Sequence, residues 1–178
     1  GPDASMTMAR TASALPSPSR RAFLRGRARA ETPLRPPWAL AEGDFTNMCT
    51  ACHACLSACP EKVLVRGSGG YPVFDPGRGE CTFCGACEAA CEPRALRRDA
   101  GQAPWTLVAH ASGACLPLQG VVCRSCRDAC GEDAIAFAPG ALQAPAIDTD
   151  RCTGCGACVG TCPTSAISLQ ARPRAEAA

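Results

Sequence analysis

Short apolar runs separated by turn-forming residues are the main pattern of the chain after residue 60. Residues 62–65 and 71–75 are typical of β-strands, and the glycines within 67–70 predict a tight turn between them. The same arrangement predicts a second hairpin from two runs and a turn at residues 134–137, 139–140 and 146–148. A further strand is expected at 105–109, inside a connecting region at 94–120.

The first 37 residues show no such pattern. They are rich in Ser, Pro, Ala and Arg, which predicts a disordered arm, and the residues before Met6 resemble an expression-tag scar. Trp38 and Phe45 follow this arm and are expected to be buried anchors of the first folded unit. No apolar run is long enough to span a membrane.

Sixteen cysteines fall into four motifs, and none is left over. The last motif reads C-x2-C-x2-C-x3-C-P, the bacterial ferredoxin signature for a [4Fe–4S] cluster. In the third motif the first gap has grown to seven residues. The four motifs are Cys49, Cys52, Cys55, Cys59; Cys81, Cys84, Cys87, Cys91; Cys115, Cys123, Cys126, Cys130; and Cys152, Cys155, Cys158, Cys162.

The period of the motifs groups them in pairs. The step from Cys59 to Cys91 is 32 residues, as is the step from Cys130 to Cys162, whereas Cys91 to Cys130 is 39. Fixed self-similarity of this kind marks repeated structural units. We therefore expect two ferredoxin-like units of two clusters each, with the fourth cysteine of each motif on a short helix, such as residues 88–90 before Cys91.

Two other uses of cysteine fit less well. Disulfides give no reason for repeated identical spacings, and structural zinc sites use separated C-x2-C pairs. In two-cluster ferredoxins the fourth cysteine of one motif ligates the cluster of the other. This predicts four [4Fe–4S] clusters held by Cys49, Cys52, Cys55, Cys91; by Cys81, Cys84, Cys87, Cys59; by Cys115, Cys123, Cys126, Cys162; and by Cys152, Cys155, Cys158, Cys130.

Composition and charge fit a metal-dependent fold. The chain has one Tyr, two Trp and five Phe, so its units need metal centres to supplement a small core, and the cluster-free protein is expected to be largely unfolded. The formal net charge is +2, and four clusters would bring it to roughly −6. Such a body would repel phosphate, which argues against nucleic-acid binding.

The sequence contains no catalytic constellation. No Cys–His–Asp set or phosphate-binding glycine loop is found, and every cysteine is assigned to a cluster, so we expect an electron-transfer or accessory protein, not an enzyme. His53 and Arg124 follow the second cysteine of their motifs. Either could donate a hydrogen bond to sulfur or be an exposed polar residue with no such role.

The arm carries a motif of its own. Residues 19–25, with Arg20, Arg21, Phe23 and Leu24, resemble a twin-arginine export signal. A signal peptide continues with an apolar region of roughly 7–15 residues, whereas residues 26–31 are charged. We therefore expect a cytoplasmic protein in which this motif is either a chance arginine-rich patch or a docking element that imitates a signal.

These observations predict an α+β fold of two tandem bacterial 2[4Fe–4S] ferredoxin-like units after a disordered basic arm. The expected divisions are the arm at 1–37, the first unit at 38–100, the second unit at 101–172 and a tail at 173–178.

The chain resembles the NapF-type ferredoxins. The resemblance covers about residues 19–170 and is carried by the motif at 19–27, by residues 35–38, by all 16 cysteines and by the displaced third motif. It implies a cytoplasmic protein that associates with the catalytic molybdenum subunit of periplasmic nitrate reductase before export and aids its maturation. A general electron carrier, or an electron-transfer subunit of another oxidoreductase, is the alternative; a simple carrier has no need of a signal-like arm.

Overall fold

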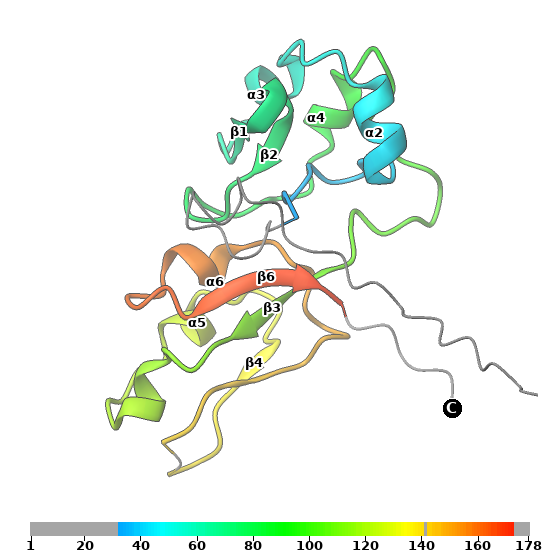
Figure 1. The fold of residues 1–178 in the computed structure, drawn as a ribbon. Coiled ribbons are helices and arrows are strands. Elements are labelled where there is room, and N and C mark those ends of the chain that lie inside the picture. The colour runs from blue at the N-terminus through cyan, green and yellow to red at the C-terminus, as the bar shows by residue number, and fades with distance from the viewer. Residues whose placement is uncertain (1–31, 141, 173–178) are drawn as a thin grey trace, which may run out of the picture. The chain divides into compact units, whose positions relative to one another are not determined.

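The computed structural model describes residues 32–140 and 142–172, of which 33–172 belong to one compact unit. We call residues 33–100 the first half and 101–172 the second half (Figure 1). The first half contains α2 (Glu42–Met48), α3 (Ala54–Ala58), β1 (Leu64–Arg66), η1 (Ser68–Gly70), β2 (Pro72–Phe74) and α4 (Ala86–Ala89). The second contains β3 (Leu107–Ala111), η2 (Leu116–Gln119), α5 (Ser125–Asp128), β4 (Ile135–Ala136), β5 (Ala146–Ile147), α6 (Ala157–Gly160) and β6 (Ile167–Ala171).

Both predicted hairpins are present and antiparallel. In the first, β1 pairs with β2 so that Leu64 lies opposite Phe74, and both side chains are buried. The connection needs glycine, because Gly69 and Gly70 have φ of 69° and 80°, a region that side chains disfavour. In the second, β4 pairs with β5, with Ile135 opposite Ile147. The strands are shorter than the apolar runs that predicted them.

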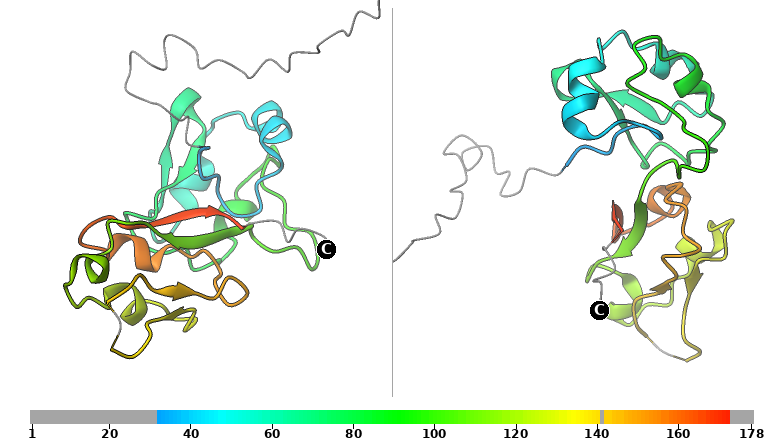
Figure 2. Two further views of the ribbon diagram at one scale, coloured as in Figure 1. Left: turned by 60° about the horizontal axis from the view of Figure 1, so that its bottom comes forward. Right: turned by 90° about the vertical axis from the view of Figure 1, so that its right-hand side faces the viewer.

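A third antiparallel pair closes the second half. Strand β3 pairs with β6 along five residues, and the two run side by side in Figures 1 and 2. Strand β3 lies two residues beyond the predicted 105–109, and β6 was not predicted at all. In the first half the corresponding closure is a single bridge between Ala39 and Leu96. Each half is thus closed by pairing a segment before its first motif with a segment after its last.

The expected place of the fourth cysteine was wrong. Each short helix carries the third cysteine of its motif, and the fourth follows the helix end. Three of these helices begin directly after a left-handed residue, at His53, Gly85 and Gly156, which leaves the third cysteine in the first turn. Cys59 is extended at φ −70° and ψ 113° because the following Pro60 disfavours helical backbone.

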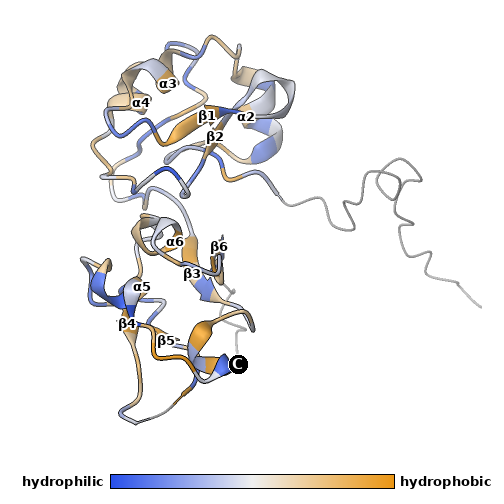
Figure 3. Ribbon diagram, turned by 90° about the vertical axis from the view of Figure 1, so that its left-hand side faces the viewer, coloured by the Kyte–Doolittle hydropathy of each residue, from blue (hydrophilic) through white to orange (hydrophobic). Residues whose placement is uncertain are grey.

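The core is small and built from both strands and cysteines. Trp38 is 3% exposed and Phe45 is completely buried, which confirms both as core anchors. Figure 3 shows hydrophobic residues on β1 and hydrophilic residues on α2. Among the described residues, no helix combines the length and the apolar character that crossing a bilayer requires. The predicted arm, apart from residues 32–37, and the tail lie outside the described residues.

Candidate metal centre

The cysteines gather in groups that combine three sulfurs of one motif with the fourth of its partner motif. One cavity is lined by Cys49, Cys52, Cys55 and Cys91. A second is lined by Cys81, Cys84, Cys87 and Cys59. A third is lined by Cys115, Cys123, Cys126 and Cys162, so the displaced third motif still brings its cysteines together.

The remaining cysteines surround Cys158. Burial and the neighbouring thiols of Cys155, Cys152, Cys126 and Cys130 raise the pKa of Cys158 to about 12. Three of these neighbours are those that the crossed arrangement predicts, and Cys126 belongs to the adjacent group. We call the four groups the Cys52, Cys84, Cys123 and Cys155 quartets, after the second cysteine of the contributing motif.

The quartets suit a cluster in both space and chemistry. Each presents four sulfurs, the donor set of a [4Fe–4S] cluster. In three quartets the four cysteines line one shared cavity. Four cysteines that line one cavity fit an iron–sulfur cube.

Burial sets the protonation of the free thiols. Burial, and to a smaller extent the neighbouring thiols, raise the pKa of Cys55, Cys81 and Cys126 to about 11 and that of Cys87 to about 12. At neutral pH these metal-free thiols keep their protons. Cluster binding must therefore release protons, and the positive charge of iron compensates the buried thiolates.

Backbone amides donate to four cysteine sulfurs, one in the Cys52 quartet, one in the Cys123 quartet and two in the Cys155 quartet. The N–H groups of Leu96, Ala109 and Ala134 donate to the sulfurs of Cys91, Cys152 and Cys130, each at 3.4 Å. The N–H of Ala166 donates to Cys162 at 3.2 Å. Burial alone would raise the pKa of Cys162, but hydrogen bonds from the amides of Thr164, Ala166 and Ile167 lower it overall. Amides in this position stabilise thiolate ligands.

The same turn follows every motif. Three residues after each fourth cysteine the backbone is left-handed, with φ between 50° and 60°, and the N–H of that residue donates to the carbonyl of the cysteine. Only non-glycine residues occupy this position: Lys62, Arg94, Asp133 and Ser165. These four side chains differ in type, so no common residue marks the turn in the sequence.

The third motif departs from the others before its helix. Residue Arg124 has φ −138°, whereas His53, Gly85 and Gly156 at the same position are left-handed. The long first gap holds η2, and the side chains of Leu118 within it and of Val121 and Val122 after it are exposed. The displaced spacing thus changes the loop and leaves the quartet intact.

Neither polar residue beside a second cysteine is bonded to sulfur. Arg66 donates to Nδ1 of His53 at 3.1 Å, and Nε2 of His53 contacts the carbonyl of Gly70 at 2.9 Å. The Arg124 guanidinium lies 4.9 Å from the centre of the Phe137 ring. Both side chains organise neighbouring loops. The predicted docking residues Arg20, Arg21, Phe23 and Leu24 lie outside the described residues.

Comparison with known proteins agrees with this site. The profile of the 4Fe-4S dicluster domain matches residues 48–96, and that of the 4Fe-4S binding domain matches residues 145–168. The ferredoxin-type protein NapF of Escherichia coli K12 is 43% identical over 155 residues, which cover 85% of this chain and 94% of that protein. NapF of Haemophilus influenzae is 43% identical over 138 residues, covering 76% and 78%.

A further relative bears a different name. The methylamine utilization ferredoxin-type protein MauM of Methylobacillus flagellatus is 37% identical, over 86% of this chain and 74% of that protein. The NapF relatives are more similar and are covered over more of their length. With its cysteine quartets and its domain matches, the chain belongs to the NapF family of ferredoxin-type iron–sulfur proteins.

Proposed function

We propose that the chain holds four [4Fe–4S] clusters, one in each quartet, in two ferredoxin-like units at residues 38–100 and 101–172. The observation that carries this proposal is the lining of three cavities by quartets of crossed composition. Bound clusters would supply one-electron transfer. The chain's own residues would hold the clusters through sulfur, shield them with a small apolar core and stabilise thiolates with backbone amides.

We propose further that the protein is a cytoplasmic accessory protein without a catalytic site of its own. It binds the catalytic molybdenum subunit of periplasmic nitrate reductase before export and aids maturation of that subunit, through electron transfer or cluster assembly. Family membership supports this role, as does the arm with Arg20, Arg21, Phe23 and Leu24. We propose neither a nucleic-acid partner nor a membrane-spanning segment for the protein.

A second candidate function is electron transfer to another oxidoreductase, as a general carrier or a subunit. The observation that favours it is the similarity to proteins named for methylamine utilization. The basic arm distinguishes the two candidates, because electron transfer alone requires only the clusters and a docking surface.

Co-purification of the nitrate reductase catalytic subunit with the cluster-loaded chain tests the proposal. The full chain should retain the subunit, and a variant without residues 6–34 should lose it. Arg20→Ala with Arg21→Ala should act like the deletion, whereas Arg27→Ala with Arg29→Ala removes the same charge outside the motif and should retain binding. Equal capture by all four proteins, or by none, would contradict the proposed role.

A further inference from the structure

The two halves meet through residues that belong to two quartets. The N–H of Cys81 donates to the carbonyl of Cys155 with an N···O distance of 2.8 Å. Cys81 is a member of the Cys84 quartet, and Cys155 is a member of the Cys155 quartet. The two thiols are also close enough for Cys155 to raise the pKa of Cys81. One backbone hydrogen bond therefore joins the edges of two candidate cluster sites.

This junction is tightly packed. A Cβ on Gly156 would lie 2.9 Å from the Phe74 ring and 2.9 Å from Cβ of Pro76, both in the first half. The centre of the Trp105 ring lies 4.9 Å from that of the Phe74 ring, with the rings tilted by 34°, and Nε1 of Trp105 donates to the carbonyl of Thr153 at 2.9 Å. A side chain of any size at Gly156 would push the halves apart or distort the Cys155 loop.

Inside each half, the helices that carry third cysteines pack together. Helix α3, with Cys55, lies against α4, with Cys87, and α5 and α6 repeat this arrangement with Cys126 and Cys158. Each packed pair joins an outer quartet to an inner one. The Cys52 quartet neighbours the Cys84 quartet, and the Cys123 quartet neighbours the Cys155 quartet.

We propose that the four sites form one row in the order Cys52, Cys84, Cys155 and Cys123 quartets. The Cys123 quartet, whose motif comes third in the sequence, then lies at the end of the row, and the Cys155 quartet lies next to the Cys84 quartet. The inference rests on the proposed four-cluster assignment. Cys81 and Cys155 hold the inner two clusters side by side. One electron can then leave the reduced member of this pair and enter the oxidised member, with no bond broken and no proton moved. The Gly156 contact with Phe74 fixes the spacing.

Magnetic interaction between reduced clusters tests the order. Cys52→Ala with Cys123→Ala removes one ligand from each outer quartet and should leave an inner pair whose electron paramagnetic resonance signals are split by mutual coupling. Cys84→Ala with Cys155→Ala leaves the outer pair, whose signals should be those of isolated clusters. Splitting in the second protein but not the first, or in neither, would overturn the proposed order.

Iron content separates failure of this order from failure of the cluster assignment. The unaltered chain should hold about 16 iron atoms, and each double variant about eight. An unaltered chain with far less iron contradicts the cluster assignment itself. Full iron with the wrong coupling contradicts the order alone.

A pair of glycine variants decides the question if a double variant fails to fold. Gly156→Ala and Gly85→Ala stand at equivalent motif positions with similar left-handed φ, 90° and 80°. At Gly85 the added Cβ would meet only an arginine nitrogen at 3.5 Å. In the fully reduced protein, Gly156→Ala should lose the inter-half part of the coupling and Gly85→Ala should keep it. Identical spectra for both variants would contradict the proposal.

Discussion

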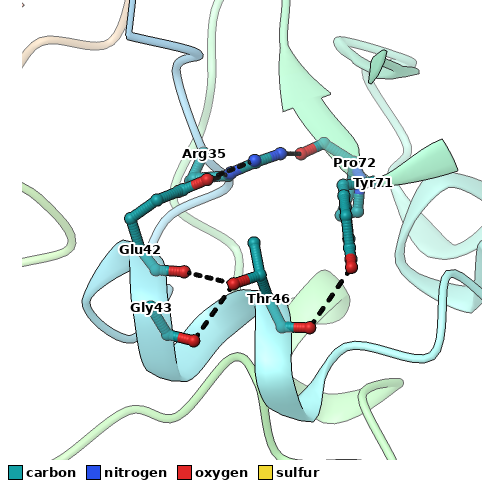
Figure 4. A network of polar contacts seen from close by, with 6 residues as sticks. All are labelled: Arg35, Glu42, Gly43, Thr46, Tyr71 and Pro72. Carbon is teal, nitrogen blue, oxygen red and sulfur yellow. Dashed lines mark hydrogen bonds and ion pairs between the residues drawn. The ribbon is translucent and has the colours of Figure 1, made fainter. Parts of the chain in front are cut away.

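Arg35 and Glu42 form a two-pronged ion pair that ties the entering chain to α2 (Figure 4). Nε of Arg35 donates to one carboxylate oxygen at 2.9 Å and Nη2 to the other at 2.6 Å. Nη1 donates to the carbonyl of Pro72 at 3.1 Å, and the guanidinium lies 4.9 Å from the Phe45 ring centre. One side chain therefore connects the segment before α2, the helix itself and strand β2.

Loss of this guanidinium should destabilise the cluster-loaded protein. Arg35→Ala removes the ion pair, the carbonyl contact and the cation–π contact, and should lower the free energy of unfolding by about 1–3 kcal/mol. Arg97→Ala removes an exposed pair with Asp99 and should change it by less than about 0.5 kcal/mol. Guanidinium titration followed by visible absorbance measures both. Equal midpoints would contradict the structural role of Arg35.

The same pair predicts a pH dependence. The hydrogen bond from Arg35 lowers the pKa of Glu42 below its ordinary 4.5, because it stabilises the carboxylate. The contribution of this hydrogen bond to the stability of the fold is therefore fully present above pH 4.5 and is lost as the pH falls through the lowered pKa of Glu42. The stability difference between the unaltered chain and Glu42→Gln should be constant from pH 7 to 5 and should shrink at lower pH. A difference that grows on acidification would contradict this.

Much of the site could be predicted from the cysteines alone. The 32-residue steps predicted which motifs pair, and three cavities in the structure are lined by cysteines in that crossed combination, whereas the ligation itself stays a prediction. Apolar runs predicted both hairpins because a buried strand needs consecutive or alternating apolar residues. Both signals come from residues close together in the chain, and such local patterns can be recognised in a single sequence.

The remaining features depend on packing between distant segments. Strand β6 alternates buried Ile167 and Leu169 with exposed residues. This alternation is present in the sequence, but it is short and directly follows the last cysteine motif, so it did not lead to a predicted strand. Helix α2 precedes the first motif without an N-cap side chain, so it gave no start signal. The bond between Cys81 and Cys155 joins residues 74 positions apart, and no periodicity records it.

Metal removal should unfold most of the chain. Buried cysteines contribute a large part of the core beside few large apolar side chains, so the fold needs the clusters they would hold. Anaerobically purified protein should contain iron and acid-labile sulfide in equal amounts, about four of each per cluster, and negligible zinc. Chelation of the iron should remove both visible absorbance and ordered secondary structure in circular dichroism. A colourless, zinc-loaded and folded protein would contradict the cluster assignment.

Crossed ligation predicts which cysteines act together. Cys91 lines the same cavity as Cys52, and Cys59 the same cavity as Cys84. Cys91→Ser should therefore perturb the same paramagnetic resonance signal as Cys52→Ser, and Cys59→Ser the same signal as Cys84→Ser. Spectra that pair Cys59→Ser with Cys52→Ser would show ligation within single motifs and contradict the two-unit arrangement.

The signal-like arm should fail as an export signal. Residues 26–31 are charged where a signal peptide has its apolar region. A reporter that works only in the periplasm, fused to residues 6–45, should stay inactive. A matched fusion in which residues 26–31 are replaced by leucines and alanines should restore export. Transport of the unaltered fusion that depends on Arg20 and Arg21 would contradict the proposed cytoplasmic location.

The strand pairings that close the two halves can form at different times during synthesis on the ribosome. The first half closes with Ala39 opposite Leu96, whereas β3 must wait for Ala171 at the far end of β6. At about 5–20 residues per second, those 75 further residues take about 4–15 s to synthesise. During that interval both segments that close the first half exist, although its contacts to Cys155 and Gly156 are still to form, and the second half has an open edge. Assembly of the protein should therefore run from its N-terminal half to its C-terminal half.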